Sequence, residues 1–307
     1  DGFRMDAAMH IFGQGETVKG TNTADATANW WNEFDLYCRS INPNYYLVGE
    51  VWDDAIKRAK FSASFDSTFN FDVAEATGII GMVASKHDKN SKANKFVDDM
   101  IDTYARLEKT NAQFIDAPFL TNHDTQRAAD ILKGDVPSLK LAANIYMTLK
   151  GNPFIYYGEE IGMLGNKPDE KIREPFVWGN DDQAQTSWEA LTENKGTESM
   201  AKQDQDASSL LNHYRGLIAM RNGSSALTDG DFASLNVTNN QIIAFSRQSA
   251  DQKVVVIHNL ATESVDVLAS EVLHSQATLY YASNPFTYNG EETLTIPAQT
   301  TVILIVE

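Results

Sequence analysis

The stretch NYYLVGEVW (residues 44–52) decides the fold, because a run of aromatic and apolar residues ends abruptly at a glycine and a glutamate. Runs of this composition, bounded by polar residues, are typical of buried strands. Two further stretches repeat the pattern: QFIDAPFLTNHD (113–124) ends at a histidine and an aspartate, and NPFIYYGEE (152–160) ends at two glutamates. Each of these expected strands therefore carries its polar residues at its carboxyl end.

Helical patterns separate the strands. Apolar residues recur at helical spacing in 91–109, in SLKLAANIYMTLKG (138–151) and in ASSLLNHYRGLIAMRNG (207–223). Gly151 and Gly223 are predicted to end the last two of these helices. Alternation of strand and helix is the signature of an α/β protein whose parallel sheet has crossover helices. In a (β/α)8 barrel the active site lies at the carboxyl ends of the strands, where the polar residues stand here.

Five strands are expected in this part of the chain, near residues 1–6, 44–50, 65–71, 114–121 and 152–158. A closed barrel of this kind has eight. The sequence therefore predicts that residues 1–223 form the C-terminal part of a TIM barrel, about its last five strands, with residue 1 inside a strand. The edges of an open sheet carry unpaired backbone groups. We therefore expect the missing half, or a second copy of the chain, to complete the barrel.

The pattern changes at about residue 224. Short apolar strands separated by Asn, Asp and Gly turns follow, as in NQIIAFSRQSADQKVVVIHNL (240–260). Strands of this length and spacing predict an antiparallel β-sandwich over residues 224–307.

Composition excludes several classes of protein. The 307 residues carry a formal net charge of −17, and a surface of this sign repels phosphate backbones, so no nucleic-acid partner is expected. The chain has no run of 18 apolar residues, so no helix is expected to span a membrane. A single cysteine, Cys38, excludes a disulfide framework and a cysteine-rich zinc site. Its apolar setting favours a buried core thiol.

Three carboxylates, Asp6, Glu50 and Asp124, each stand at the end of a different expected strand. An acidic residue at such a place is commonly a helix cap or a solvated turn residue, but the neighbours of these three point to chemistry. Arg4 lies two residues before Asp6, on the same side of the strand, where it favours an ionised carboxylate. His123 stands beside Asp124 as a donor for sugar hydroxyls. Two facing carboxylates, one ionised and one protonated, can cleave a glycosidic bond.

DGFRMDAAMH (1–10), GEVWD (49–53) and FLTNHD (119–124) resemble three short motifs of glycoside hydrolase family thirteen, the α-amylase family, in the family's order. The loop GEEIGMLGNKPDEKIREPFVW (158–178) resembles the segment after the last barrel strand in bacterial members. The resemblance implies that Asp6 is the nucleophile of a retaining mechanism and that Glu50 is the general acid and base. It implies that Asp124 is the third carboxylate, which binds the 2- and 3-hydroxyls of the sugar.

The resemblance also implies a set of substrate-binding residues. Arg4 and His123 match residues that hold the nucleophile and the sugar before the scissile bond. His10 matches a residue whose side chain lines the leaving-group side and whose backbone carbonyl binds calcium, although a histidine at the start of a helix would look the same. Further candidates, each with a plainer alternative, are Asp169 and Arg173 for the next sugar, or a surface ion pair, and Trp52 for stacking on a sugar, or core packing.

Two family features are absent from these residues: the remaining motif, an Asp with an Asn-His pair near the third strand, and the inserted subdomain that carries most calcium ligands. Calcium is therefore expected in the intact enzyme, with most ligands outside this chain. Ala7 after the nucleophile favours an α-amylase that acts on α-1,4 bonds of starch and maltooligosaccharides. The alternatives are an α-glucosidase or oligo-1,6-glucosidase of the same family, and a truncated, inactive fragment that only binds glucan. A polymeric substrate predicts an extracellular or cell-envelope location.

Overall fold

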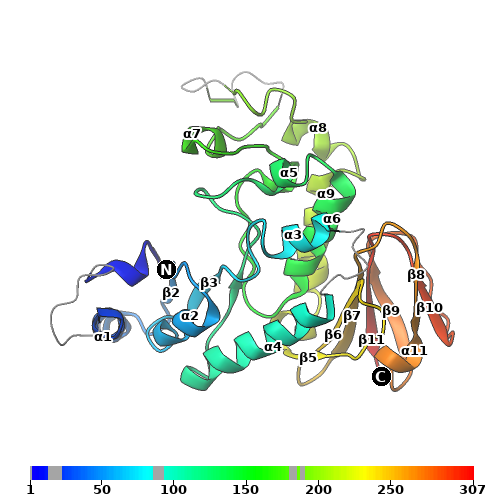
Figure 1. Ribbon diagram of the computed structural model, residues 1–307, viewed down its shortest axis with the longest axis horizontal. Helices are drawn as coiled ribbons and strands as arrows, with labels where there is room; N and C mark the ends of the chain where they lie inside the picture. The colour runs from blue at the N-terminus through cyan, green and yellow to red at the C-terminus, as the bar shows by residue number, and fades with distance from the viewer. Residues whose placement is uncertain (1, 13–22, 86–92, 180–184, 187–190) are drawn as a thin grey trace. The chain divides into compact units, whose positions relative to one another are not determined.

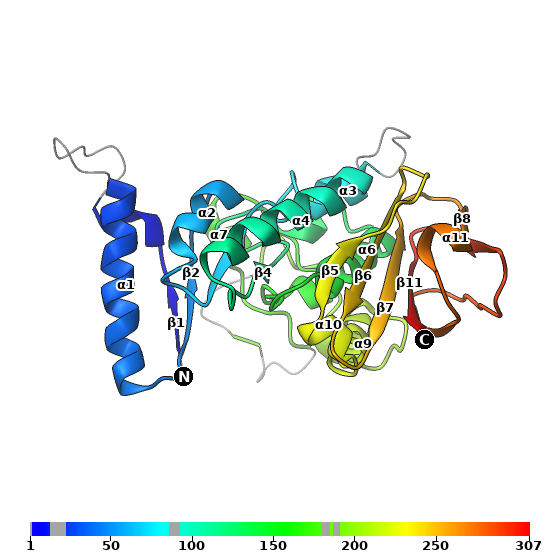
Figure 2. The same ribbon diagram turned by 90° about the horizontal axis from the view of Figure 1, so that it is seen from below.

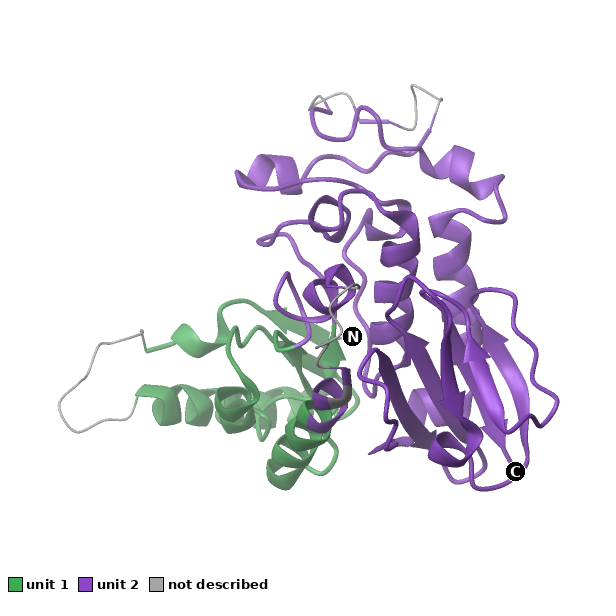
Figure 3. Ribbon diagram, turned by 45° about the vertical axis from the view of Figure 1, so that its right-hand side comes forward, with its two compact units in different colours: residues 1–72, 99–118 green, residues 73–98, 119–307 purple. Residues whose placement is uncertain are grey.

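The structure is a computed structural model that describes residues 2–12, 23–85, 93–179, 185–186 and 191–307. The chain divides into two compact units, residues 1–72 with 99–118 and residues 73–98 with 119–307 (Figure 3). The domain boundary predicted after residue 223 falls inside the second unit and stays a prediction.

The first unit is built on a parallel sheet of four strands in the order β1-β2-β3-β4 (Figures 1 and 2). The strands are β1 (Gly2–Met5), β2 (Tyr46–Gly49), β3 (Ser67–Asn70) and β4 (Ala117–Pro118). Helix α1 (Thr23–Ile41) connects β1 to β2, and α2 (Ala55–Phe61) connects β2 to β3. Four of the five expected strands are therefore confirmed as parallel strands of one sheet, in chain order.

A small core fixes the end of β1. Trp31 of α1 is buried against Leu47 of β2 and Phe65 before β3. Its indole N–H donates a hydrogen bond of 2.7 Å to the carbonyl of Ala8, in the 3-10 helix η1 (Ala8–His10) that follows β1. Cys38 is half-buried at the edge of this core with a free thiol, so the prediction of a buried core thiol is met only in part.

The second unit begins with α3 (Ile79–Ala84) and the first turns of α4 (Ala93–Thr110), a helix that the pattern over 91–109 predicts. The fifth expected strand is reduced to one parallel bridge between Phe119 and Phe154. The remaining helices of this part are α5 (Ala128–Ile131), α6 (Val136–Thr148), α7 (Asp169–Ile172), α8 (Met200–Asp204), α9 (Leu210–Asn222), α10 (Ser225–Asp229) and the 3-10 helix η2 (Glu159–Ile161). Among the described helices, none is both long enough and apolar enough for a membrane crossing.

One of the two predicted helix ends is wrong. Helix α9 ends at Asn222 with Gly223 as its cap, as predicted, but α6 ends at Thr148 with Leu149 as its cap, before Gly151. The reason is the buried guanidinium of Arg221 on α9. It donates to the carbonyls of Met147, Leu149 and Gly151 at 2.7, 3.0 and 2.5 Å, so these carbonyls need no glycine turn.

The C-terminal part of the second unit is antiparallel throughout, as predicted. One sheet has the order β5-β6-β7-β11-β9, with β5 (Asp231–Ser234), β6 (Ile242–Gln248), β7 (Lys253–Asn259), β9 (Ala277–Ala282) and β11 (Thr301–Val306). The other pairs β8 (Val265–Leu268), which leads into α11 (Ala269–Val272), with β10 (Thr293–Ile296). Figure 1 shows the strands of both sheets. Their apolar side chains meet in one core, for example Ile257, Val267 and Leu294.

A buried carboxyl group lies between the helices of the second unit. The Oε1 atom of Glu159 accepts hydrogen bonds from the hydroxyls of Tyr146, at 3.0 Å, and Tyr214, at 2.8 Å. Its Oε2 atom has no hydrogen-bond partner among the described residues. Burial raises the pKa of Glu159 to about 7 and outweighs the two tyrosine hydroxyls, which lower it.

We expect Glu159 to make the protein less stable as the pH rises. Because the pKa is higher in the folded than in the unfolded chain, the folded state holds the proton more tightly between pH 4.5 and 7. The free energy of unfolding should therefore fall across this range by up to about 3 kcal/mol. Glu159→Gln should remove this slope in denaturant titrations between pH 4 and 8, while the exposed control Glu263→Gln keeps it. Equal slopes for Glu159→Gln and the wild type would contradict the assignment.

Candidate active site

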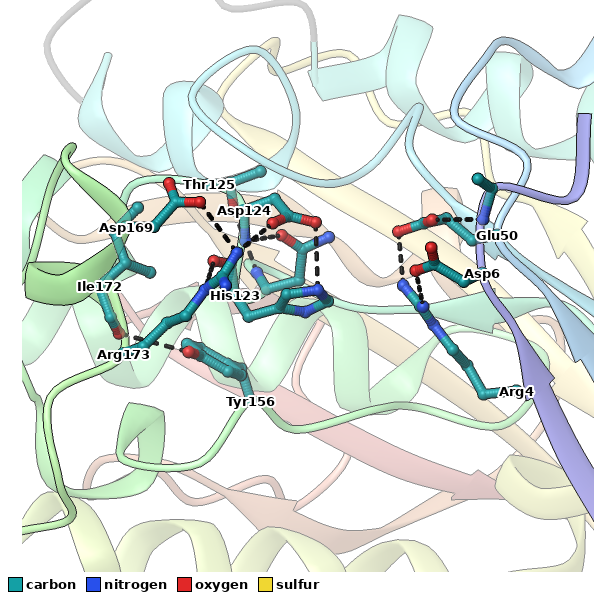
Figure 4. Close-up of polar contacts among 12 residues, drawn as sticks. Arg4, Asp6, Glu50, His123, Asp124, Thr125, Tyr156, Asp169, Ile172 and Arg173 are labelled. Atoms are coloured by element: carbon teal, nitrogen blue, oxygen red, sulfur yellow. Dashed lines mark hydrogen bonds and ion pairs between the residues drawn. The ribbon is translucent and has the colours of Figure 1, made fainter. Parts of the chain in front are cut away.

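In the first unit, one guanidinium joins two of the three predicted catalytic carboxylates (Figure 4). Arg4 pairs through Nη1 with Oδ1 of Asp6, and its Nη2 donates to Oε1 of Glu50 at 2.6 Å. The parallel register explains the meeting, because Met5 is paired with Gly49 and the next residue of each strand emerges at the same sheet edge. The predicted placement of Arg4 and Asp6 on one side of the strand is confirmed.

The two carboxylates differ in environment. The side chain of Asp6 is 75% exposed, whereas that of Glu50 is 9% exposed. Glu50 is nevertheless well supplied with donors, because its Oε2 also accepts the backbone N–H of Ala7 at 2.9 Å. Asp6 is therefore open to an approaching molecule, while Glu50 is held from both sides.

The backbone of Ala7 is a part of the site that the sequence did not predict, although the residue itself serves there as a sign of linkage specificity. Its backbone lies in the left-handed region, with φ 45° and ψ 44°, which costs a non-glycine residue about 1–3 kcal/mol. This turn directs the N–H of Ala7 at Glu50, and the next N–H, of Ala8, donates to the backbone carbonyl of Glu50 at 2.9 Å. Alanine disfavours the left-handed region, so the residue type at position 7 gives no signal for such a turn.

Trp52 and His10 lie beside this pair in the sequence, and their sugar contacts stay predictions. The ring of Trp52 stacks on Phe71 with centroids 5.0 Å apart and planes 13° apart, and 46% of Trp52 remains exposed. His10 is exposed at the end of η1, where its N–H donates to the carbonyl of Ala7 at 2.9 Å. Packing thus accounts for part of the Trp52 surface only.

The calcium contact expected in this chain is the backbone carbonyl of His10. Calcium takes six to eight oxygen ligands, and the carbonyl of His10 would supply one. No group of three or more His, Cys, Asp or Glu side chains suited to a metal occurs in the part of the chain that the structure describes. Calcium binding at His10 therefore stays a prediction.

In the second unit, a second arginine joins the other predicted residues (Figure 4). Arg173 donates through Nη2 to Oδ1 of Asp124 at 2.6 Å and to Oδ2 of Asp169 at 3.0 Å, and through Nε to the carbonyl of His123 at 2.9 Å. The ring of His123 lies 3.1 Å from the other oxygen of Asp124. The structure thus brings together four residues that the sequence placed in two separate segments.

The turn that carries Asp124 is closed by side chains. The N–H of Asp124 donates to Oδ1 of Asn122 at 2.9 Å, and the N–H of Asn122 donates to the hydroxyl of Thr125 at 3.0 Å. Such Asx and hydroxyl turns set the local backbone without help from a helix or a strand. The backbone that carries Asp124 is therefore shaped within the NHDT segment, whereas its carboxylate is held by Arg173 and His123.

The sequence model described as "Alpha amylase, catalytic domain" matches residues 1–230. The chain belongs to the α-amylase family. A second model, "Alpha-amylase SusG C-terminal domain", matches residues 242–303, which contain most of the antiparallel strands.

Relatives of the same family agree. Alpha-amylase 3 of Dictyoglomus thermophilum is 38% identical over 264 residues, which are 85% of this chain and 50% of that protein. Alpha-amylase SusG of Bacteroides thetaiotaomicron is 30% identical, over 84% of this chain and 38% of that protein. The chain thus spans half or less of the length of these α-amylases.

Solved structures of family members superpose on the whole chain. An α-amylase from H. orenii has a TM-score of 0.86 and 38% identity, and Amy13B of Eubacterium rectale has a TM-score of 0.88 and 26% identity. The match covers 100% of this chain and 61% and 60% of those chains.

A second residue that the sequence reading missed follows Arg173. Glu174 is buried and accepts hydrogen bonds from residues 192–194, including the backbone N–H groups of Thr192 at 2.7 Å and Asn194 at 3.1 Å. Burial alone would raise its pKa, but these hydrogen bonds outweigh burial and lower the pKa to about 2. Its donors come from a loop almost twenty residues further along the chain, so no local sequence motif predicts these hydrogen bonds.

We expect Glu174 to stabilise this α-amylase family chain at neutral pH and to lose that effect in acid. Its pKa is lower in the folded than in the unfolded chain, so the stabilisation is full above about pH 5 and fades as the pH falls toward 2. Glu174→Gln should lower the free energy of unfolding at pH 6 by an amount on the order of 3 kcal/mol. The gap from the wild type should narrow in denaturant titrations toward pH 3. A gap that does not change between pH 6 and pH 3 would contradict the assignment.

Proposed function

We propose that the protein containing this chain hydrolyses α-1,4-glucosidic bonds in starch and maltooligosaccharides and retains the configuration at the anomeric carbon. The observation that carries the proposal is the pair of Asp6 and Glu50 on one guanidinium of Arg4. The names of the relatives support the substrate, since two that match most of this chain are α-amylases.

The closeness of the two carboxylates supports retention. Both bind terminal nitrogens of the same planar guanidinium, so a single side chain bridges them. Retaining glycosidases hold their carboxyl groups about 5–5.5 Å apart, whereas inverting enzymes separate them by about 6.5–9.5 Å to admit a water molecule. A pair bridged by one arginine side chain fits the closer arrangement, so we propose direct attack by a carboxylate rather than attack by water from the opposite face.

The first step forms a covalent sugar–enzyme ester. An oxygen of Asp6, the more exposed carboxylate, attacks the anomeric carbon while the glycosidic oxygen leaves with a proton from Glu50. In the second step Glu50 takes a proton from water, whose oxygen displaces Asp6 and releases the sugar. Two attacks from opposite sides give net retention.

The proton on Glu50 requires a rearrangement of its hydrogen bonds. Both of its oxygens accept hydrogen bonds in this structure, one from Arg4 and one from Ala7. A protonated Glu50 must direct its O–H at the leaving oxygen, so we propose that Arg4 then pairs with Asp6 alone. The N–H of Ala7 keeps the other oxygen in place. Arg4 would thus bind both carboxylates when Glu50 is ionised and only Asp6 when Glu50 is protonated.

His123 and Asp124 are proposed to hold the sugar by its hydroxyl groups. One oxygen of Asp124 is fixed by Arg173 and the other lies against the ring of His123. A carboxylate fixed in this way accepts hydrogen bonds from neighbouring hydroxyls, and an imidazole can donate one to them. Asp169 and Arg173 would contact the next sugar.

A catalytic role of Glu50 predicts that Glu50→Gln lowers kcat on a blocked maltooligosaccharide by about 10²–10⁴-fold, because glutamine keeps the size and one acceptor but cannot transfer the proton. Binding of the same oligosaccharide should persist in calorimetry. Asp53→Asn is the matched control, since this carboxylate lies three residues away and pairs with Lys57 on the surface. Full activity of Glu50→Gln would remove Glu50 from the mechanism.

Linkage specificity separates the proposal from its closest alternative. Relatives at 27% and 29% identity are named cyclomaltodextrinase and neopullulanase, so an enzyme with other α-glucan preferences belongs in the comparison. We expect a higher kcat/KM on maltotriose than on isomaltotriose, measured by release of reducing sugar. A preference for isomaltotriose would favour an oligo-1,6-glucosidase instead.

A further inference from the structure

The segment from Ile172 to Glu174 is held from two directions, and its middle residue, Arg173, carries the contacts to Asp124 and Asp169. The side chain of Arg173 is long and 44% exposed. An exposed ion pair contributes little when its side chains must be ordered from many rotamers. The position of the Arg173 guanidinium therefore depends on the contacts that fix the backbone of residues 172–174.

One support comes from a buried arginine and two tyrosines. Arg127 donates through Nε to the carbonyl of Ile172 at 2.8 Å, and its guanidinium lies 4.4 and 4.8 Å from the ring centres of Tyr156 and Tyr157. The hydroxyl of Tyr156 donates to the carbonyl of Ile172 at 3.2 Å (Figure 4). The hydroxyl of Tyr157 donates to the carbonyl of Glu174 at 2.9 Å. The carbonyls on both sides of Arg173 are thus tied down.

The other support is the carboxylate of Glu174. Its Oε1 accepts from the N–H and hydroxyl of Thr192 and from the N–H of Glu193, and its Oε2 accepts from the N–H and the side-chain amide of Asn194. The side chain of Asn194 also bonds both the N–H and the carbonyl of Leu164, at 2.7 and 3.0 Å. A single buried carboxylate therefore ties three stretches of chain together.

We infer that Glu174 is a positioning residue for glucan binding, which acts by holding Arg173 against Asp124. This inference rests on the proposed function, because it takes Asp124 and Arg173 as contacts of the sugar. A buried charge with this many donors is a rigid anchor, since moving it would leave it unpaired in a medium of low dielectric constant. Because Arg173 is the next residue, its backbone is held in place as well. The carboxylate of Asp124, which Arg173 binds, is then fixed too.

The test is a double-mutant cycle in the natural protein at its full length. Kinetics on a blocked maltooligosaccharide would be compared for the wild type, Glu174→Gln, Arg173→Ala and the double variant. Glutamine retains an acceptor but turns an N–H₂ group toward other donors, so we expect KM to rise about tenfold with little change in kcat. Because Glu174 acts through Arg173, the double variant should be no worse than Arg173→Ala alone.

A matched control separates positioning from general loosening. Glu271 accepts the N–H and hydroxyl of Thr238 in the same way, on the antiparallel part of the chain, and Glu271→Gln should leave KM unchanged. If Glu174→Gln does not fold, Asn194→Ala, which removes one donor from the carboxylate, takes its place in the cycle. An unchanged KM, or effects of the two substitutions that simply add, would overturn the inference.

The outcome for the wild type separates this inference from the proposed function. A wild type that hydrolyses no glucan contradicts the proposed function, and the same cycle is then read from maltooligosaccharide binding by calorimetry. Coupled losses of affinity would support the inference without catalysis. A wild type that binds no maltooligosaccharide would overturn both.

Discussion

The candidate active site depends on the guanidinium of Arg4 between Asp6 and Glu50. Two carboxylates this close repel each other, and a shared planar cation offsets that repulsion while fixing both in direction. The contact exists because β1 and β2 are parallel and in register, so that the residues following them meet at one edge. Trp31, which ties α1 to the carbonyl of Ala8, keeps the loop after β1 against that edge.

In the second unit, Arg173 likewise joins two carboxylates through one guanidinium. A surface arginine is shared between Asp124 and Asp169, and its backbone is held by buried groups. In both units buried charged residues support exposed ones. Glu50 shares Arg4 with the exposed Asp6, and the buried Arg127 and Glu174 hold the backbone around the exposed Arg173. Exposed groups can then meet a substrate without first losing much conformational entropy, which is how an arrangement of this kind contributes to binding and rate.

Much of the fold follows from local patterns. Buried parallel strands leave continuous apolar runs that end in polar residues, so the strands near 44–50 and 65–71 and their parallel arrangement could be predicted. The two-residue spacing likewise predicts that Arg4 and Asp6 lie on one side of their strand. Features that depend on distant partners could not be predicted. The end of α6 is set by Arg221, and Glu174 finds its donors in residues 192–194. The left-handed turn at Ala7 depends on Glu50, whose side chain comes from another strand and accepts the N–H of Ala7.

The central claim is that Asp6 forms the covalent bond to the sugar. The most direct test uses a maltosyl donor fluorinated on the sugar ring, which slows breakdown of a sugar–enzyme ester, followed by mass spectrometry of peptides from the natural protein. We predict that the added maltosyl mass lies on the peptide that contains Asp6, and that Asp6→Asn prevents labelling. An active protein labelled at Glu50, or labelled nowhere while it inverts the anomeric carbon, would contradict the claim.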